Sequence, residues 1–312
     1  MAGIRDMQLF VAAYETQSFT AAASRERATQ SGVSQHVRKL EESLGVRLFS
    51  RQGGRVAPTP AGSRYYQSCV DVLRAHAAAG RSVADYGKGV EGNIVVGLMP
   101  TMTRCLLAPV LARFIAQHPN ANVRVVEGYS ATLTEQVQAG ELDFAVVPEF
   151  LGAAGLKTRL FSQTQEVLIA RARARSRPRH GKPVRLSDLA PLKIVVPSSQ
   201  NTRRPRIETY LASNGIRIAR LLELDSMLGT LDFVARTDWV TILPALVVAD
   251  ADASRLFTVN PIVDPPFRVN LVLIEPARQP LSSAARAFVE ILEEEAARLD
   301  RSARPARRRV RS

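Results

Sequence analysis

Residues 18–49 read SFTAAASRERATQSGVSQHVRKLEESLGVRLF, and this stretch decides the fold of the N-terminal region. Ser18 suits a helix N-cap, and the alanines at 21–23 let a neighbouring helix approach closely. Between residues 31 and 44, apolar side chains recur at i, i+4, i+7 and i+11 from Val33. The stretch therefore predicts a short helix followed by a longer helix with one buried face.

The residues on either side complete a winged helix-turn-helix. Before the stretch, apolar residues at i, i+3, i+4 and i+7 from Met7 to Tyr14 predict a first helix that faces a core. After it, residues 46–51 and 55–57 predict two strands joined by a diglycine turn. A two-stranded wing with arginines at its base follows from this pattern.

The outer face of the helix over 31–44 is polar at its N-terminal end and cationic further along. Amide and hydroxyl groups can bond base edges, whereas arginines and helix N-terminal amides can hold phosphates. This distribution predicts a recognition helix. The predicted DNA-contacting residues are Gln30, Ser31, Ser34, Gln35 and Arg38, with Arg51 and Arg55 of the wing.

A long helix is predicted directly after the wing. Thr59 supplies its N-cap and Pro60 its first residue, and it runs to about Tyr86, a length of roughly 40 Å. We expect this helix to pair two subunits, because a domain this small is not expected to bury its apolar stripe. The stripe consists of Tyr66, Val70, Leu73 and Ala77.

Four ordered blocks resemble the successive signatures of LysR-type transcriptional regulators. They are SFTAAA at 18–23, QSGVSQ at 30–35, LEESLGVRLF at 40–49 and TPAG at 59–62. The resemblance implies that the 31–44 helix enters the major groove, that the wing touches the DNA backbone, and that the helix from Thr59 pairs two subunits. Gly32 stands where the family usually carries alanine or proline, and Pro58 stands where it usually carries leucine.

From residue 91 onward, short apolar strands alternate with helices, beginning with strands at 94–98, 122–127 and 142–147. Such alternation predicts an α/β sheet whose ligand sites lie off the carboxyl ends of its strands. The region resembles the family's effector domain, a two-lobed fold like the periplasmic binding proteins. The predicted domains are residues 1–59 for DNA binding, 60–90 for the linker helix, and 91–300 for effector binding. Lobe I would hold 91–160 and 267–300, and lobe II 161–266.

The resemblance also implies an effector cleft between the lobes. Its predicted residues are Pro100, Thr101, Met102, Thr103, Ser130 and Pro148 from lobe I, and Ser198, Ser199, Asn201 and Thr202 from lobe II. Hydroxyls, an amide and free backbone amides at helix starts suit a carboxylate or another small anion. Considered one at a time, these hydroxyl residues could instead only cap helices; this alternative applies to Thr101, Thr103, Ser198 and Thr202. The family usually shows a glycine-rich stretch before a Leu-Pro pair, but here the segment TDWVTILP at 237–244 has neither glycine. Trp239 in this segment is expected either to line the cleft or to pack beneath it.

Positive charge gathers at the two ends of the chain. Residues 1–90 hold 12 Lys and Arg against 7 Asp and Glu, and residues 301–312 hold 6 against none, whereas 91–300 are nearly neutral. Clustered positive charge predicts a polyanionic partner, with nucleic acid ahead of membrane; the alternative is a solvated surface. The Arg-rich tail, 301–312, is predicted to be disordered, with either no role or a sequence-independent attraction to phosphates. The arginine run at 171–179 is interpreted as a solvated edge, with DNA contact as the alternative.

Several classes of protein do not fit the sequence. No apolar run approaches the roughly 18 residues of a membrane span, and no export signature is present, so a cytoplasmic protein is expected. The spacing of Cys69 and Cys105 and of the four histidines fits neither a disulfide framework nor a metal site. No nucleophile elbow or phosphate loop is present, so we expect no enzyme activity, no cofactor and no catalytic residue. With one cysteine in the effector region, a two-cysteine redox switch is not expected.

The sequence therefore predicts a sequence-specific transcriptional regulator whose operator binding or promoter activation responds to a small anionic metabolite. The expected partners are double-stranded DNA with an interrupted two-fold operator, the small-molecule effector, a second or further copy of the chain (dimer or tetramer) and RNA polymerase, but no membrane. A plain small-molecule-binding protein would not need the N-terminal blocks. An architectural DNA-binding protein with a degenerate cleft is the other alternative.

Overall fold

The computed structural model describes residues 3–52, 55–84, 90–150, 152–172, 178–199, 201–248 and 253–303. The chain divides into two compact units. Unit 1 consists of Met1–Lys88 with two short segments, Ala153–Lys157 and Pro276–Ser282. Unit 2 consists of Gly89–Gly152, Thr158–Glu275 and Ser283–Ser312. Among the described residues, no helix is long and apolar enough to cross a membrane.

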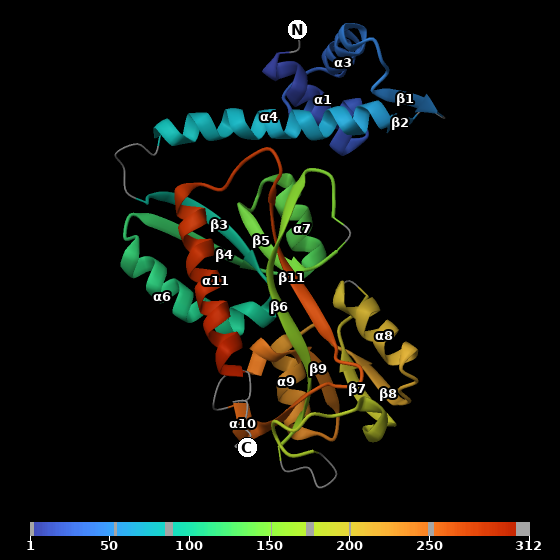
Figure 1. Ribbon diagram of the computed structural model, residues 1–312, viewed down its shortest axis with the longest axis vertical. Helices are drawn as coiled ribbons and strands as arrows, with labels where there is room; N and C mark the ends of the chain where they lie inside the picture. Colours follow the sequence, from blue (N-terminus) through green and yellow to red (C-terminus); the bar gives the residue numbers. More distant parts are fainter. Residues whose placement is uncertain are drawn as a thin grey trace, which may run out of the picture. The chain divides into compact units, whose positions relative to one another are not determined.

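Unit 1 contains three helices, a two-stranded wing and a long fourth helix (Figure 1). Its elements are α1 (Ile4–Thr16), α2 (Phe19–Arg25), α3 (Gln30–Leu44), β1 (Phe49–Gln52), β2 (Arg55–Pro58) and α4 (Pro60–Ala84). This order confirms the predicted winged helix-turn-helix with a long helix after it. The first wing strand begins three residues later than expected, at Phe49 instead of residue 46.

Side-chain caps set where these helices begin. The Ser18 hydroxyl accepts a hydrogen bond from the Ala21 N–H at 3.2 Å, and the Thr59 hydroxyl accepts one from the Gly62 N–H at 3.0 Å. Both predicted caps are confirmed. The sequence reasoning missed a third cap at Thr29, whose hydroxyl accepts from the helix α3 backbone at 3.1 Å, so α3 begins one residue earlier than expected.

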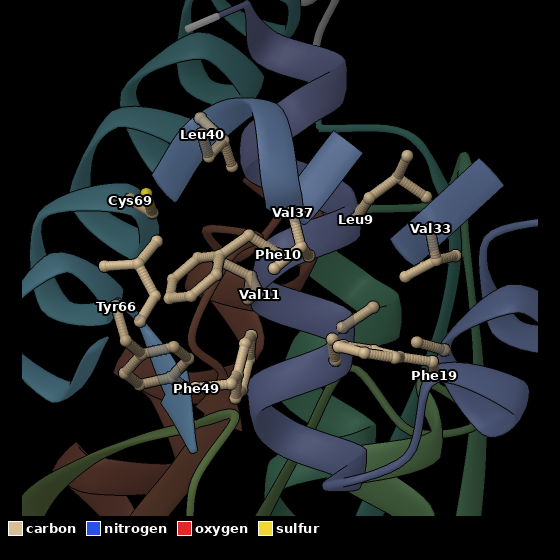
Figure 2. Close-up of a cluster of buried hydrophobic side chains, with 14 of the residues drawn as sticks. Leu9, Phe10, Val11, Phe19, Val33, Val37, Leu40, Phe49, Tyr66 and Cys69 are labelled. Carbon is tan, nitrogen blue, oxygen red and sulfur yellow. The ribbon is translucent and has the colours of Figure 1, made fainter. Parts of the chain in front are cut away.

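The core of unit 1 forms where α1, α2, α3, the wing and α4 meet (Figure 2). Phe10 is fully buried in α1, and its ring lies 5.5 Å from that of Phe49 at the start of the wing. Phe19 of α2 meets Phe49 edge to face at 5.7 Å. The predicted apolar face of α3 is buried except for its last member, Leu44, which is exposed.

The predicted dimer stripe on α4 belongs largely to this same core, which corrects the expectation. Tyr66, Val70 and Leu73 are buried, and Tyr66 stacks on Tyr14 of α1 with ring centroids 4.0 Å apart. The first half of α4 packs along α1, so these side chains do not require a second subunit to cover them. Ala77 is half-buried.

Unit 2 alternates strands and helices (Figure 1). Its first elements are β3 (Gly92–Leu98), α5 (Pro100–Met102), the π-helical turn η1 (Thr103–Leu107), α6 (Ala108–Gln117), β4 (Ala121–Glu127), α7 (Ser130–Ala139), β5 (Phe144–Pro148) and the long strand β6 (Leu156–Arg171). The rest are η2 (Leu186–Leu189), β7 (Leu192–Val196), α8 (Arg203–Ser213), β8 (Ile218–Glu223), α9 (Met227–Arg236), β9 (Val240–Pro244), η3 (Ala245–Val248), α10 (Ala253–Leu256), β10 (Phe257–Pro261), β11 (Arg268–Pro276) and α11 (Ser283–Ala303).

The strands form one mixed sheet in the order β4-β3-β5-β11-β6-β9-β7-β8, with β10 paired to β6. The outer groups are parallel, β4-β3-β5 at one end and β9-β7-β8 at the other. Strands β11 and β6 join the two groups, running antiparallel to β5 and β9 respectively. Strand β10 was not predicted from the sequence, and the strand predicted near residues 166–170 covers only the last part of β6.

Two helices of unit 2 that are far apart in the sequence lie side by side, α6 and α11 (Figure 1). Phe114 of α6 meets Phe288 of α11 with ring centroids 5.1 Å apart. The helix predicted from the sequence over 282–298 is α11, and it continues to Ala303, so residues 301–303 of the tail predicted to be disordered are helical. Residues 304–312 of the Arg-rich tail, and 173–177 within the arginine run at 171–179, lie outside the described residues.

Candidate DNA-binding and effector sites

The predicted DNA-contacting residues of α3 gather on one side of the helix. Gln30, Ser31, Gln35 and Arg38 are exposed, and Ser34 is half-buried beside them. They leave the opposite side of α3 for the core of unit 1. This face therefore offers amides, hydroxyls and a guanidinium to a polar partner.

Helix α3 also presents the amides of its first turn. The Thr29 cap occupies one of them, and a Cβ added at Gly32 would stand 3.0 Å from the Thr29 hydroxyl oxygen. Glycine at this position therefore lets the cap lie close to the helix. The remaining first-turn amides favour an anion such as a phosphate.

Asp6 of α1 pairs with His36 of α3, with Oδ1 and Nδ1 2.5 Å apart. Burial opposes ionisation of Asp6, but hydrogen bonds from the Gly3 N–H and His36, with the charges of His36 and Lys39, outweigh it and lower the Asp6 pKa. The pair ties α1 to the middle of α3.

The wing places Arg51 in β1 and Arg55 in β2, where Arg51 is opposite Val56 and Gln52 is opposite Arg55. The side chains of both arginines lie outside the described residues. Their backbone positions agree with the predicted hairpin.

The predicted effector residues of unit 2 follow the carboxyl ends of β3, β4 and β7, except for Pro148, which ends β5. Thr101 and Met102 are buried in the short helix after β3, and Pro148 is the last, buried residue of β5. Pro100 is half-buried. The helix that follows widens into a π-helical turn at Thr103, a local distortion that is frequent at functional sites.

One hydrogen bond joins the two predicted halves of the effector site. Ser130, at the start of α7, and Thr202, just before α8, lie with their hydroxyl oxygens 2.7 Å apart. Within the described residues, the Thr202 hydroxyl makes this bond and does not cap α8. Tyr129 makes a second link, because its hydroxyl donates to the backbone carbonyl of Asp225.

The side chains of two other predicted residues, Thr103 and Asn201, make local hydrogen bonds. The Thr103 hydroxyl bonds to the Pro100 carbonyl at 3.1 Å and to the Glu127 carboxylate. The Asn201 side-chain oxygen accepts from the N–H of Arg203 at 3.0 Å and so supports the start of α8. Their side chains therefore serve the structure around the site. Ser198 is half-buried, with its backbone N–H bonded to the Asp225 carboxylate at 2.9 Å, and Ser199 is exposed.

The sequence reasoning missed a buried ion pair next to Thr202. The Arg203 guanidinium holds the Glu166 carboxylate through contacts of 2.7 and 2.8 Å, and it also donates to the Ile242 carbonyl at 3.2 Å. The two side chains are only 7% and 1% exposed. The pair anchors the start of α8 to β6 and β9. A single glutamate before an apolar strand run, at residues 166–170, was the one available signal.

Trp239 packs away from the predicted effector residues. It precedes β9 at the amino end of that strand, whereas those residues follow the carboxyl ends of neighbouring parallel strands. Its ring meets Phe233 at 5.7 Å, and the Arg220 guanidinium lies 5.7 Å above it. The Trp239 ring therefore packs against Phe233 and Arg220, at the amino end of β9.

The two cysteines differ in their surroundings. Cys69 lies in the core of unit 1 (Figure 2), whereas Cys105 is half-buried in unit 2. Burial raises the pKa of Cys69 to about 11, and a hydrogen bond with Tyr65 lowers it only in part. Among the described residues, no group of three or more His, Cys, Asp or Glu could hold a metal ion.

Cys69 is therefore expected to be inert in the folded chain. Because the thiolate is the reactive form, a thiol with a pKa near 11 reacts slowly at pH 8. Ellman's reagent should label Cys105 first, and Cys69 only after denaturant unfolds unit 1. Equal labelling rates for the Cys69→Ser and Cys105→Ser variants in native buffer would contradict this expectation.

Both regions of the chain match known protein families. Residues 87–297 match the family model "LysR substrate binding domain", and residues 4–63 match "Bacterial regulatory helix-turn-helix protein, lysR family". The regulator BenM of Acinetobacter baylyi is 26% identical over 84% of this chain and 86% of its own. The nitrogen assimilation regulatory protein nac of Escherichia coli is 25% identical over 92% of this chain and 93% of its own.

Solved structures agree with the fold. CbnR, a LysR family regulator solved with its target DNA, superposes with a TM-score of 0.52 at 23% identity, covering 97% of this chain and 100% of its own. An OxyR variant of Corynebacterium glutamicum gives a TM-score of 0.60 at 20% identity and 97% coverage of both chains. The chain therefore belongs to the family of LysR-type transcriptional regulators, with a regulatory helix-turn-helix followed by a LysR substrate-binding domain.

Proposed function

We propose that this regulator reads a specific operator through α3 and the wing, and that a small anionic metabolite held near Ser130 and Thr202 changes its action there. The observation that carries the DNA half is the exposed polar surface of α3, which includes Gln30, Gln35 and Arg38. The CbnR structure with target DNA supports a DNA-bound state for this architecture.

The DNA half of the proposal predicts different effects for two kinds of residue. Gln30→Ala should reduce the preference for operator over random DNA by about 1 to 3 kcal/mol, because a base contact is lost. Arg38→Ala should weaken binding to both DNAs and reduce the slope of log affinity against log salt by about one, because a phosphate contact is lost. Competition gel shifts over a salt series measure both, and an unchanged preference in Gln30→Ala would contradict base reading.

The effector half rests on the Ser130–Thr202 hydrogen bond, which joins residues of the two halves of the site. The two halves of the site can be joined, with Ser130 and Thr202 bonded, or separated. A ligand shifts the equilibrium between these two arrangements only by the difference between its binding free energies for them. Hydroxyls and nearby helix starts favour a carboxylate over a cation. Thr101 and Thr202 are the proposed contacts.

We expect Thr101→Val and Thr202→Val to abolish the response to the effector, because each keeps its shape but loses its hydroxyl. Both residues belong to unit 2, which does not contain α3 or the wing. The DNA affinity of each variant without ligand should therefore stay within about twofold of the wild-type value, a change well below the tenfold that corresponds to about 1.4 kcal/mol. A thermal-shift screen of small carboxylates would identify a ligand, followed by operator titrations with and without it. Ser187→Ala, on η2, is the matched hydroxyl control. A normal response in both valine variants would refute this site.

A second copy of the chain would supply the other half of a two-fold operator. Because the Tyr66 stripe is buried in unit 1, we assign the pairing surface to the opposite side of α4. Val72 is 42% exposed there, and Ala75 and Ala79 follow at i+3 and i+7 on the same exposed side. Small side chains at this spacing allow close approach of a second helix.

A further inference from the structure

The carboxylate of Glu41 lies between the recognition helix and the wing. Its Oε1 accepts hydrogen bonds from the backbone N–H groups of Leu48 at 2.8 Å and Phe49 at 3.1 Å. Its Oε2 accepts from Arg47 at 3.0 Å. The Glu41 side chain is 9% exposed, so the backbone bonds are shielded from water and compensate the cost of burying the charge.

The same piece of backbone is held on its other edge by the start of α4. The Thr59 hydroxyl donates to the Arg47 carbonyl at 2.7 Å, and the Thr59 N–H donates to the Leu48 carbonyl at 3.0 Å. A Cβ added at Gly62 would stand 2.1 Å from the Leu48 carbonyl oxygen, so only glycine permits this approach. The donors and acceptors of the chain entering the wing are thus satisfied from both sides.

We propose that Glu41 is a positioning residue for DNA binding, fixing the wing to α3 so that both engage the operator as one prearranged surface. The inference rests on the proposed function, because it assumes that α3 and the wing both contact DNA. Glu41 is buried whereas Gln35 and Arg38 are exposed, and its carboxylate is bonded to the wing backbone, so it acts through the wing and not by touching DNA. A wing held before binding avoids the entropy cost of ordering it on the DNA.

The test is a double-mutant cycle on the full chain, with affinities measured by fluorescence anisotropy. The probe is a DNA duplex selected from a random library by the wild-type chain. In the wild-type background, Arg51→Ala should lower affinity about tenfold, equivalent to about 1.4 kcal/mol. In the Glu41→Ala background, Arg51→Ala should lower affinity less than twofold. The wing is no longer fixed there, so Arg51 contributes little to DNA binding even before it is replaced.

Two further backgrounds separate positioning from a merely structural role. Glu42→Ala changes the neighbouring carboxylate, which is 64% exposed and pairs with Arg38, so the Arg51→Ala loss should stay near tenfold. Glu41→Gln keeps an oxygen that can accept from both backbone N–H groups and should restore at least a fivefold loss. If circular dichroism shows Glu41→Ala to be unfolded, Glu41→Asp replaces it, since its carboxylate is one methylene shorter. In the Glu41→Asp background, Arg51→Ala should lower affinity less than fivefold.

Each outcome decides a different point. A tenfold Arg51→Ala loss in every folded Glu41 background would overturn the positioning role while leaving the proposed function intact. No Arg51→Ala loss in the wild-type background would overturn DNA contact by the wing, and the Glu41 proposal with it. The proposal is supported if the affinity loss caused by Arg51→Ala is largest with Glu41, smaller with Gln and smallest with Ala at position 41, and stays near tenfold in the Glu42→Ala background.

Discussion

Leu73→Asp should unfold unit 1, whereas Val72→Asp should leave it folded. Leu73 is 5% exposed and packs in the core with Phe10 and Tyr66, so an aspartate there buries a charge with no partner provided for it. The loss of apolar packing and the charge burial together are expected to cost more than about 4 kcal/mol of unfolding free energy. Urea titration followed by far-ultraviolet circular dichroism measures the loss.

Val72 is the adjacent control, because the same substitution on the exposed side of α4 leaves the core intact. Val72→Asp should instead disrupt pairing, which analytical ultracentrifugation detects as a shift toward monomer. The only tryptophan, Trp239, lies in unit 2, so its fluorescence should change in neither variant. A stably folded Leu73→Asp variant that merely dissociates would return Leu73 to a subunit interface and contradict the core assignment.

Arg203→Leu should destabilise unit 2 by about 3 to 5 kcal/mol, because it leaves the buried Glu166 carboxylate without its counterion. The double variant Arg203→Leu with Glu166→Leu should recover most of that loss, since an apolar pair leaves no buried charge. Urea unfolding followed by Trp239 fluorescence reports on unit 2.

The matched control for this pair is Arg236→Ala. Arg236 pairs with Asp232 at 2.9 Å, but both side chains are largely exposed, so its loss should cost less than about 1 kcal/mol. Equal losses for Arg203→Leu and Arg236→Ala would show that burial of the Glu166–Arg203 pair does not control stability. No recovery in the double variant would assign the loss to packing instead of charge.

Local patterns in the sequence predicted most of the first unit. The caps at Ser18 and Thr59 and the apolar face of α3 were identified because a cap or a helical face depends on residues within a few positions. The stripe from Tyr66 was assigned to the wrong partner. Periodicity reveals which side of a helix is apolar, but it does not reveal whether the same chain or another copy covers that side.

Pairings between distant residues were the part that the sequence could not reveal. Glu166 meets Arg203 across 37 positions, and no spacing rule connects them. Glu41 bonds to backbone groups seven and eight residues later, and a backbone partner leaves no mark in the sequence. The Ser130–Thr202 contact joins residues implied by family resemblance, although only the fold shows that their hydroxyls meet.

Sequence-specific DNA reading by α3 can be measured by selection from a random duplex library with the full wild-type chain and with Gln30→Ala. The wild-type chain should enrich an interrupted two-fold motif, and Gln30→Ala should enrich a motif with relaxed preference at one position of each half-site. Arg38→Ala should enrich the wild-type motif with lower yield, because phosphate contacts carry no sequence information. An identical motif from the wild-type and Gln30→Ala chains, or no motif from the wild-type chain, would contradict sequence-specific reading by α3.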